Sequence, residues 1–189
     1  MLVKNDLFDY ENRAIYQDSE YFKFSLDSIL LAEYVDIKTD DLITVDLCAG
    51  NMVIPLILSK YSDNKIFGFE IQEVIYNLGE KSIKLNHLEN NLFVINDDVK
   101  NIGKYFDKKS IDIMVCNPPF FKVDEKSHLN DNEYLKIARH EIKINLEEIG
   151  NRILKNVPSQ NQKYVKSQLE LLDNNLFDYI SYWDEKYYR

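Results

Sequence analysis

The chain has 189 residues, which suits one domain with room for a hydrophobic core. Thirteen tyrosines and ten phenylalanines argue against disorder, and no apolar run approaches the roughly 20 residues of a membrane span. The net charge of -9 gives no general support for binding to nucleic acid, so RNA binding would need a local basic patch.

The N-terminal part of the chain predicts no signal segment and one early helix. The first residues, MLVKNDLFDY, lack the apolar region of a secretion signal, so we expect a soluble, cytoplasmic protein. Residues 25–35, SLDSILLAEYV, predict a helix that Ser25 caps. Its apolar side should be formed by Leu26, Ile29, Leu30 and Tyr34.

Apolar runs then alternate with helical patterns. Helices are expected at residues 52–61, where Pro55 falls in the first turn, and at residues 73–88. The alternation indicates right-handed crossover units, and therefore an α/β fold with a mainly parallel sheet and helices on both faces. The predicted strands are Leu42–Leu47, residues 65–70, residues 91–98 and residues 110–117.

The second half of the chain has a different pattern. Residues 122–132, KVDEKSHLNDN, predict a polar loop. Residues 133–157 predict a long helix with apolar residues at three-four spacing, which ends before Pro158. The last 30 or so residues predict further helix and a short aromatic segment.

The cysteines and histidines do not predict a metal site. Cys48 and Cys116 each follow an apolar run in no metal-ligand spacing, so we expect reduced packing residues. The three histidines, His87, His128 and His140, are scattered along the chain.

All four predicted strands end in polar residues or glycine, and such ends line the ligand-binding edge of a parallel sheet. Asp46 and Gly50 follow the first strand, where a glycine lets the backbone approach a ligand. Glu70 could accept two bonds from a ribose diol, and Asp97 or Asp98 could accept one from an adenine amino group. Each feature also has an ordinary explanation as a turn or a solvated acid.

The fourth strand ends in CNPPFF, which is the most specific signal in the chain. Asn117 offers an acceptor oxygen and two donors. Pro118 and Pro119 fix the backbone, so that carbonyls and carboxamide point in defined directions. Phe120 offers a face for stacking on a planar base. Two acceptors that hold an exocyclic amine out of conjugation with its ring would make the amine nitrogen nucleophilic. The ordinary explanation of the same motif is a rigid turn after the strand.

Asn-Pro-Pro-aromatic resembles the catalytic motif of amino-group methyltransferases that act on adenine, cytosine or glutamine. Together, FKFSLDSILLAEYV, DLCAGNMVIPLIL, FGFEIQE, INDDVKN, CNPPFFK and IARHEI resemble the bacterial tRNA adenine-N6 methyltransferases that modify valine tRNA beside the anticodon. The resemblance covers about residues 5–150. It implies a Rossmann-like fold that uses S-adenosylmethionine, with residues 1–150 as the methyltransferase domain and tRNA as substrate.

The resemblance also implies roles for single residues. The target base would be held by Asn117, Pro118 and Phe120. The helix from Ser25, with Asp27, would cover the cofactor. Asp46 and Gly50 would border its methionine part. Glu70 would bind the ribose hydroxyls and Asp98 the adenine.

Two departures from the family stand out. Met52 occupies a position where the family turn has a second glycine, so its side chain either crowds the cofactor or leans away. No apolar run after residue 150 fits the strands with which the family continues, so these strands are missing or have diverged, and residues 151–189 form an atypical helical tail. A sheet without its last strands would expose an edge.

Three interpretations therefore remain. The leading one is an enzyme that methylates an adenine amine in tRNA, as a monomer or weak dimer without a metal or membrane partner. The second keeps the chemistry but acts on DNA adenine or protein glutamine, and the acidic charge favours a protein substrate. The third is a truncated, inactive methyltransferase-like binding domain.

Overall fold

The computed structural model describes residues 2–7, 12–21, 26–35, 37, 43–107 and 110–117. The expected loop at residues 122–132, the long helix at residues 133–157 and the C-terminal tail lie outside the described residues. Pro118, Pro119 and Phe120 also lie outside them.

A parallel sheet forms the centre of the fold, as the sequence predicted. Within the described residues this sheet has four strands in the order β5-β4-β3-β6, and each neighbouring pair is parallel. Asp46 is in register with Gly68 of β4 and with Val115 of β6. The strands are β3 (Ile43–Asp46), β4 (Lys65–Phe69), β5 (Leu92–Ile95) and β6 (Ile113–Val115).

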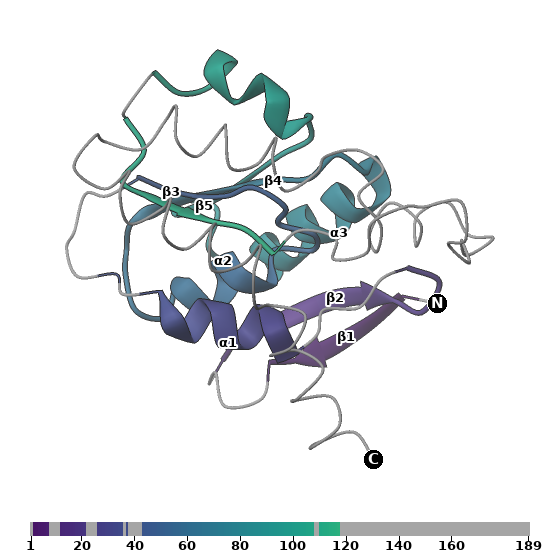
Figure 1. The fold of residues 1–189 in the computed structure, drawn as a ribbon. Helices are drawn as coiled ribbons and strands as arrows, with labels where there is room; N and C mark the ends of the chain where they lie inside the picture. The colour runs from purple at the N-terminus through teal and green to yellow at the C-terminus, as the bar shows by residue number, and fades with distance from the viewer. Residues whose placement is uncertain are drawn as a thin grey trace, which may run out of the picture.

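Helices cover both faces of the sheet (Figure 1). The α-helices of the described residues lie below it in this view, while the 3₁₀ helix η1 lies above it. They are α1 (Leu26–Tyr34), α2 (Val53–Leu58), α3 (Glu73–Leu85) and η1 (Val99–Lys104). The predicted α/β, Rossmann-like arrangement is therefore confirmed. None of the helices in the described ranges is long and apolar enough to cross a membrane.

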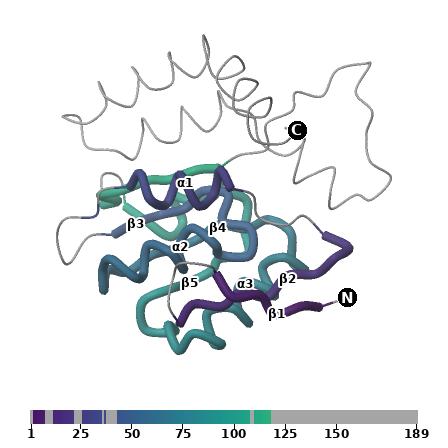
Figure 2. The backbone as a smooth tube through the Cα atoms, turned by 90° about the horizontal axis from the view of Figure 1, so that it is seen from below, coloured from purple at the N-terminus to yellow at the C-terminus, as the bar shows by residue number. Residues whose placement is uncertain are grey.

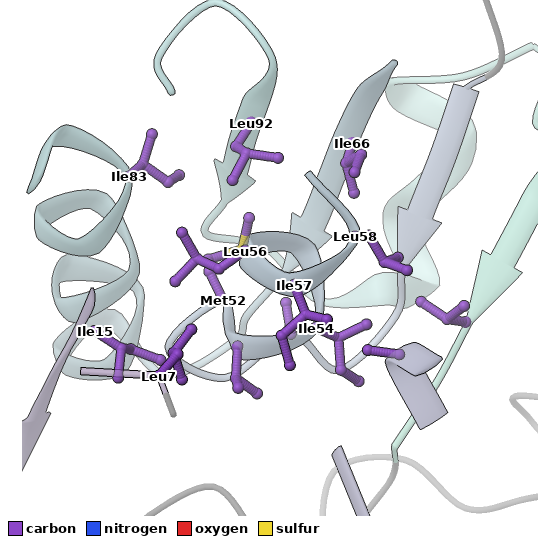
Figure 3. Close-up of a cluster of buried hydrophobic side chains, with 14 residues drawn as sticks. Leu7, Ile15, Met52, Ile54, Leu56, Ile57, Leu58, Ile66, Ile83 and Leu92 are labelled. Atoms are coloured by element: carbon purple, nitrogen blue, oxygen red, sulfur yellow. The ribbon is translucent and has the colours of Figure 1, made fainter. Parts of the chain in front are cut away.

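Alternation along the strands divides the core into two layers. Ile66 of β4 packs toward α2, where all six residues of that helix are buried. Phe67 and Phe69 point to the opposite face, where they meet Phe106 after η1. Figure 3 shows the first layer around α2. A period of two puts Glu70, two residues after Gly68, on the same side of the sheet as α2.

The structure adds an N-terminal hairpin that the sequence did not predict. Strands β1 (Leu2–Asp6) and β2 (Ala14–Asp18) pair antiparallel and lie beside α3 (Figure 2). Side chains at the C-terminal end of α3 hold the backbone of β2. Asn86 bonds both N and O of Ala14, at 2.9 and 2.6 Å. Ser82 Oγ accepts from Tyr16 N at 2.9 Å.

The prediction of which side of the first helix is buried is wrong. Leu26, Leu30 and Tyr34 are exposed by 47, 58 and 75%. The buried residues of α1 are Ser28 and Ala32, whose small side chains let the helix pack closely on its neighbours. Of the predicted apolar set, only Ile29 packs against the core.

Candidate active site

The four parallel strands bring their carboxyl ends to one edge of the sheet. Asp46 is the last residue of β3, and Glu70 directly follows β4. Asp97 and Asp98 come two and three residues after β5, and Asn117 comes two residues after β6. Since neighbouring strand ends lie side by side, these residues form one rim, as the sequence predicted.

Asp46 is a buried carboxyl with one oxygen already in use. Its side chain is fully buried, and Oδ1 accepts from the backbone N of Cys48 at 3.3 Å. Its other oxygen, Oδ2, is buried and has no hydrogen-bond partner in the described ranges. Burial raises the pKa of Asp46 to about 7, and the negative charge of Glu70 also raises it. This carboxyl therefore needs a donor or a positive charge that the described residues do not supply.

Glu70 is the second buried carboxyl at the rim, exposed by only 8%. Its Oε1 accepts from Gln72 N at 2.7 Å, and the backbone N–H groups of Gly50 and Ile71 also favour its ionised form. Burial outweighs these bonds and raises the pKa of Glu70 to about 7. The carboxylate thus connects the end of β4 to the glycine turn after β3.

Gly50 shapes that turn. Its φ of 55° is left-handed, and no atom beyond its neighbours lies within 4 Å of the position that a Cβ would take. The turn therefore leaves space beside the backbone, next to Glu70. Asn51, the next residue, donates from Nδ2 to the carbonyl of Tyr16 at 3.1 Å, so the N-terminal hairpin supports the turn.

The structure separates the two aspartates after β5. Asp97 accepts from Asn101 Nδ2 at 2.7 Å and from Tyr105 Oη at 2.9 Å, so both of its oxygens hold η1 in place. These bonds lower the pKa of Asp97. Asp98 caps η1 through Oδ1, which accepts from Lys100 N at 2.8 Å. Asp98 is the better candidate for an outside ligand, because its cap of η1 engages only one of its oxygens, Oδ1.

Asn117 is held by the helix that packs beside it. Its Nδ2 donates to Oγ of Ser28 on α1 at 2.9 Å. Ser28 is only 4% exposed, while Asn117 is half-buried. The bond fixes the carboxamide and leaves Oδ1 as an acceptor. Asp27, the neighbour of Ser28, is exposed and lies in the first turn of the same helix.

Met52 does not crowd the rim, because its side chain leans into the core. The residue has a φ of 73° and is fully buried at the start of α2 (Figure 3). A Cβ on Gly68 would collide with the sulfur of Met52, and a Cβ on Gly79 would lie 2.9 Å from its Cγ. The two glycines therefore make room for the methionine.

Two features of the site were not predicted. Ser28 gave no signal, because a serine inside a helix usually only bonds its own backbone. Ile71 is an exposed apolar side chain (37%) directly after Glu70, and it offers a flat apolar contact at the rim. No three His, Cys, Asp or Glu side chains within the described ranges are grouped to hold a metal ion.

Comparison with known proteins gives two curated relatives. Both are named tRNA1(Val) (adenine(37)-N6)-methyltransferase. The protein of Cytophaga hutchinsonii is 23% identical over 147 residues, which is 78% of this chain and 60% of the relative. That of Haemophilus influenzae is 26% identical over 135 residues, or 70% of this chain and 56% of the relative. The chain thus spans under two thirds of either relative.

A solved structure supports the fold. The crystal structure of a protein from Pyrococcus horikoshii, described as a transferase, matches with a TM-score of 0.50 and 17% identity. The match covers 60% of this chain and 41% of the other. The sequence pattern of the methyltransferase small domain matches residues 23–154, which is most of the chain and includes every predicted site residue. The chain therefore belongs to the methyltransferase small domain family.

Proposed function

We propose that the protein transfers a methyl group from S-adenosylmethionine to the exocyclic amine of an adenine in tRNA. The family membership and the names of the two curated relatives support this proposal. The observation that carries it is the position of Asn117, whose carboxamide is held at the sheet edge by Ser28. The two buried carboxyls of Asp46 and Glu70 lie at neighbouring strand ends.

The rim fits S-adenosylmethionine in three respects. The unpartnered Oδ2 of Asp46 would accept from the ammonium group of the methionine part, which also supplies positive charge. Glu70 would accept from the two ribose hydroxyls, and the open turn at Gly50 would let the ribose approach the backbone. Asp98 would accept from the adenine amine, with Ile71 against the ring. The cofactor supplies the methyl group on a positively charged sulfur.

The chain itself positions the amine that is methylated. Oδ1 of Asn117 would accept one amine hydrogen, and the carbonyl of Pro118 would accept the other. This holds the nitrogen lone pair out of the ring, so that it can attack in line with the leaving sulfur. Orientation of the two reactants supplies most of the rate in such a transfer. Phe120 would stack on the base, which is worth about 1–3 kcal/mol.

A protein glutamine or a DNA adenine would present a similar amide or amine to Asn117. The net charge of -9 favours a protein substrate over a nucleic acid, whereas the named relatives favour tRNA. Transfer of labelled methyl groups to bulk tRNA, with DNA and protein as parallel substrates, decides between them. Label in tRNA adenine supports the proposal, and label only in DNA or protein contradicts the substrate. Absence of S-adenosylmethionine binding by the folded protein contradicts the activity altogether.

A further inference from the structure

Two cysteines meet between the residues proposed to bind cofactor and substrate. Cys48 Sγ lies 3.7 Å from Cys116 Sγ, and both thiols are free and half-buried. Cys48 follows Asp46 by two residues, and Cys116 directly precedes Asn117. The backbone bond from Leu47 N to Val115 O, at 2.9 Å, holds the two strand ends together. The sequence predicted that both cysteines are reduced packing residues and did not predict this contact.

We propose that Cys48 and Cys116 form a reversible disulfide that turns the site off under oxidising conditions. A disulfide has an S–S distance of about 2.05 Å, so the two sulfurs must approach by roughly 1.7 Å. Adjacent strands of a sheet lie about 4.8 Å apart, within reach of the Cα separation of about 4.4–6.8 Å that disulfides show. Neighbouring strand ends can therefore be joined with little movement of the sheet.

The oxidant is a small disulfide such as glutathione disulfide. The Cys48 thiolate attacks one glutathione sulfur, which forms a mixed disulfide and releases one glutathione thiolate. The Cys116 thiolate then attacks the Cys48 sulfur and releases the second glutathione. Two protein thiols lose two protons and two electrons, and one glutathione disulfide becomes two glutathione molecules.

The environment of the pair favours this order of attack. The pKa of the Cys116 thiol is raised by its hydrogen bond with Cys48, by burial and by the negative charge of Asp46. Because Cys116 Sγ donates its hydrogen bond to Cys48 Sγ, we assign the first attack to Cys48, and Cys116 enters the reaction once the mixed disulfide lies next to it. Because the reacting sulfurs are already neighbours, the second step is intramolecular.

The consequence for the site rests on the proposed function. Drawing Cys116 toward Cys48 would move Asn117, the next residue, relative to Ser28 on α1. A misplacement of about 1 Å can cost about 100-fold in rate. We therefore expect the oxidised protein to lose methyl transfer by about 10- to 100-fold while its sheet stays folded.

The chain offers a direct test, because these are its two cysteines. The folded, reduced protein is equilibrated with glutathione disulfide and glutathione at a series of ratios, and its intact mass is measured after acid quenching. The proposal expects the loss of two hydrogen atoms without a bound glutathione, and full reversal by dithiothreitol. Stable glutathione adducts on both cysteines, or two unmodified thiols at every ratio, would overturn it.

Matched variants separate the disulfide from other oxidation. In Cys48→Ser the remaining cysteine should give at most one glutathione adduct, and in Cys116→Ser likewise. At glutathione ratios where the variants carry no adduct by mass, the ratio of activity with oxidant to activity with reductant should fall for the wild type and stay near one for both variants. Equal inactivation of the variants would overturn the switch.

Failure of the proposed function would look different. If the reduced protein transfers no methyl group to any substrate, the proposed function fails, while the mass measurement still decides whether the disulfide forms. The temperature of unfolding provides an additional readout for each form. A disulfide that leaves the activity of an active enzyme unchanged overturns the switch and spares the function.

Discussion

Asn117 on the sheet edge and Ser28 on α1 are joined by a hydrogen bond of 2.9 Å between Nδ2 and Oγ. The two residues are 89 positions apart in the chain, and the packing of α1 brings Ser28 against the carboxamide and fixes its orientation. With Nδ2 engaged by Ser28, Oδ1 is the carboxamide atom that the proposed function assigns to the substrate amine. The bond therefore relates an early helix directly to the proposed chemistry.

The first prediction concerns Asn117 itself. Asn117→Ala should fold and bind S-adenosylmethionine but lose methyl transfer by about 100-fold or more, the scale for removing a preorganised polar contact to a transition state. Methyl transfer is measured with labelled cofactor, and cofactor binding by calorimetry. An Asn117→Ala enzyme with near wild-type rate would contradict the role of the carboxamide.

The second prediction treats Ser28 as a positioning residue. Ser28→Ala should lower kcat by about 10-fold and leave the KM for S-adenosylmethionine nearly unchanged, because only the orientation of Asn117 is lost. In the Asn117→Ala background the same change should have no further effect. Ser59→Ala is the matched control. This buried serine donates a hydrogen bond of 2.7 Å to Leu56 O, and it lies at the end of α2, away from the rim. An equal loss of kcat in both serine variants would indicate general destabilisation instead.

The third prediction concerns the cofactor. Glu70→Ala should weaken S-adenosylmethionine binding by about 1.5–3 kcal/mol, the usual contribution of hydrogen bonds to a charged group. Affinity for tRNA should change far less. Glu73→Ala serves as the control, because Glu73 is an exposed acid at the start of α3. Unchanged cofactor affinity in Glu70→Ala would place the ribose elsewhere.

The fourth prediction follows from the pKa of Asp46 and Glu70, both raised to about 7 in the folded protein. A carboxyl group whose pKa is higher in the folded than in the unfolded protein stabilises the folded state. This contribution to the free energy of unfolding is complete below the unfolded pKa of about 4 and is lost as the pH rises through about 7. Each group contributes a slope of at most about 1.4 kcal/mol per pH unit in that window. Asp46→Asn should therefore lose less stability than the wild type between about pH 5 and pH 8.

Urea unfolding at several pH values measures this slope. Donors from the cofactor would lower both pKa values, so S-adenosylmethionine binding near pH 7 should release protons, which calorimetry in buffers of different ionisation enthalpy detects. A parallel pH dependence in wild type and Asp46→Asn would show that Asp46 does not titrate in this range.

The sequence was sufficient for the sheet and its rim because both depend on local patterns. The runs that lead to Asp46, Glu70, Asp98 and Asn117 are short and mostly apolar, and each of them ends in that polar residue. The buried side of α1 could not be predicted in the same way. Leu26 and Leu30 have the spacing of a core face, yet the helix turns Ser28 inward because its partner is the polar end of β6.

Long-range contacts account for the other differences. The N-terminal hairpin depends on Ser82 of α3 and on Asn86, the residue that caps this helix. Both are more than 60 residues away from β2, and the sequence pattern of the helix indicates only its apolar face. Cys48 and Cys116 are likewise 68 residues apart, and only the order β3-β6 makes them neighbours. Such pairs follow from topology, which one sequence does not reveal.

The last prediction tests how the chain accommodates Met52. The left-handed backbone of a non-glycine residue costs about 1–2 kcal/mol, whereas removing a buried methionine side chain costs about 2–5 kcal/mol. Met52→Gly should therefore destabilise the protein, although glycine suits the backbone better. Gly79→Ala should be neutral or destabilising in the wild type, because its Cβ would lie 2.9 Å from Met52 Cγ.

The effect of Gly79→Ala on the free energy of unfolding should change sign in a variant that lacks the Met52 side chain. In the Met52→Gly background, Gly79→Ala should stabilise the protein by about 0.5–1 kcal/mol, because alanine favours the helix and its other contacts are at 3.6 Å or more. Gly68→Ala should remain destabilising in both backgrounds, because its Cβ would also lie 2.6 Å from Ala49 Cβ. Gly103→Ala, with no atom within 4 Å, should behave alike in both. Urea unfolding of the single and double variants gives the coupling energy, and a value near zero for Met52 and Gly79 would mean that the methionine side chain does not lie against α3.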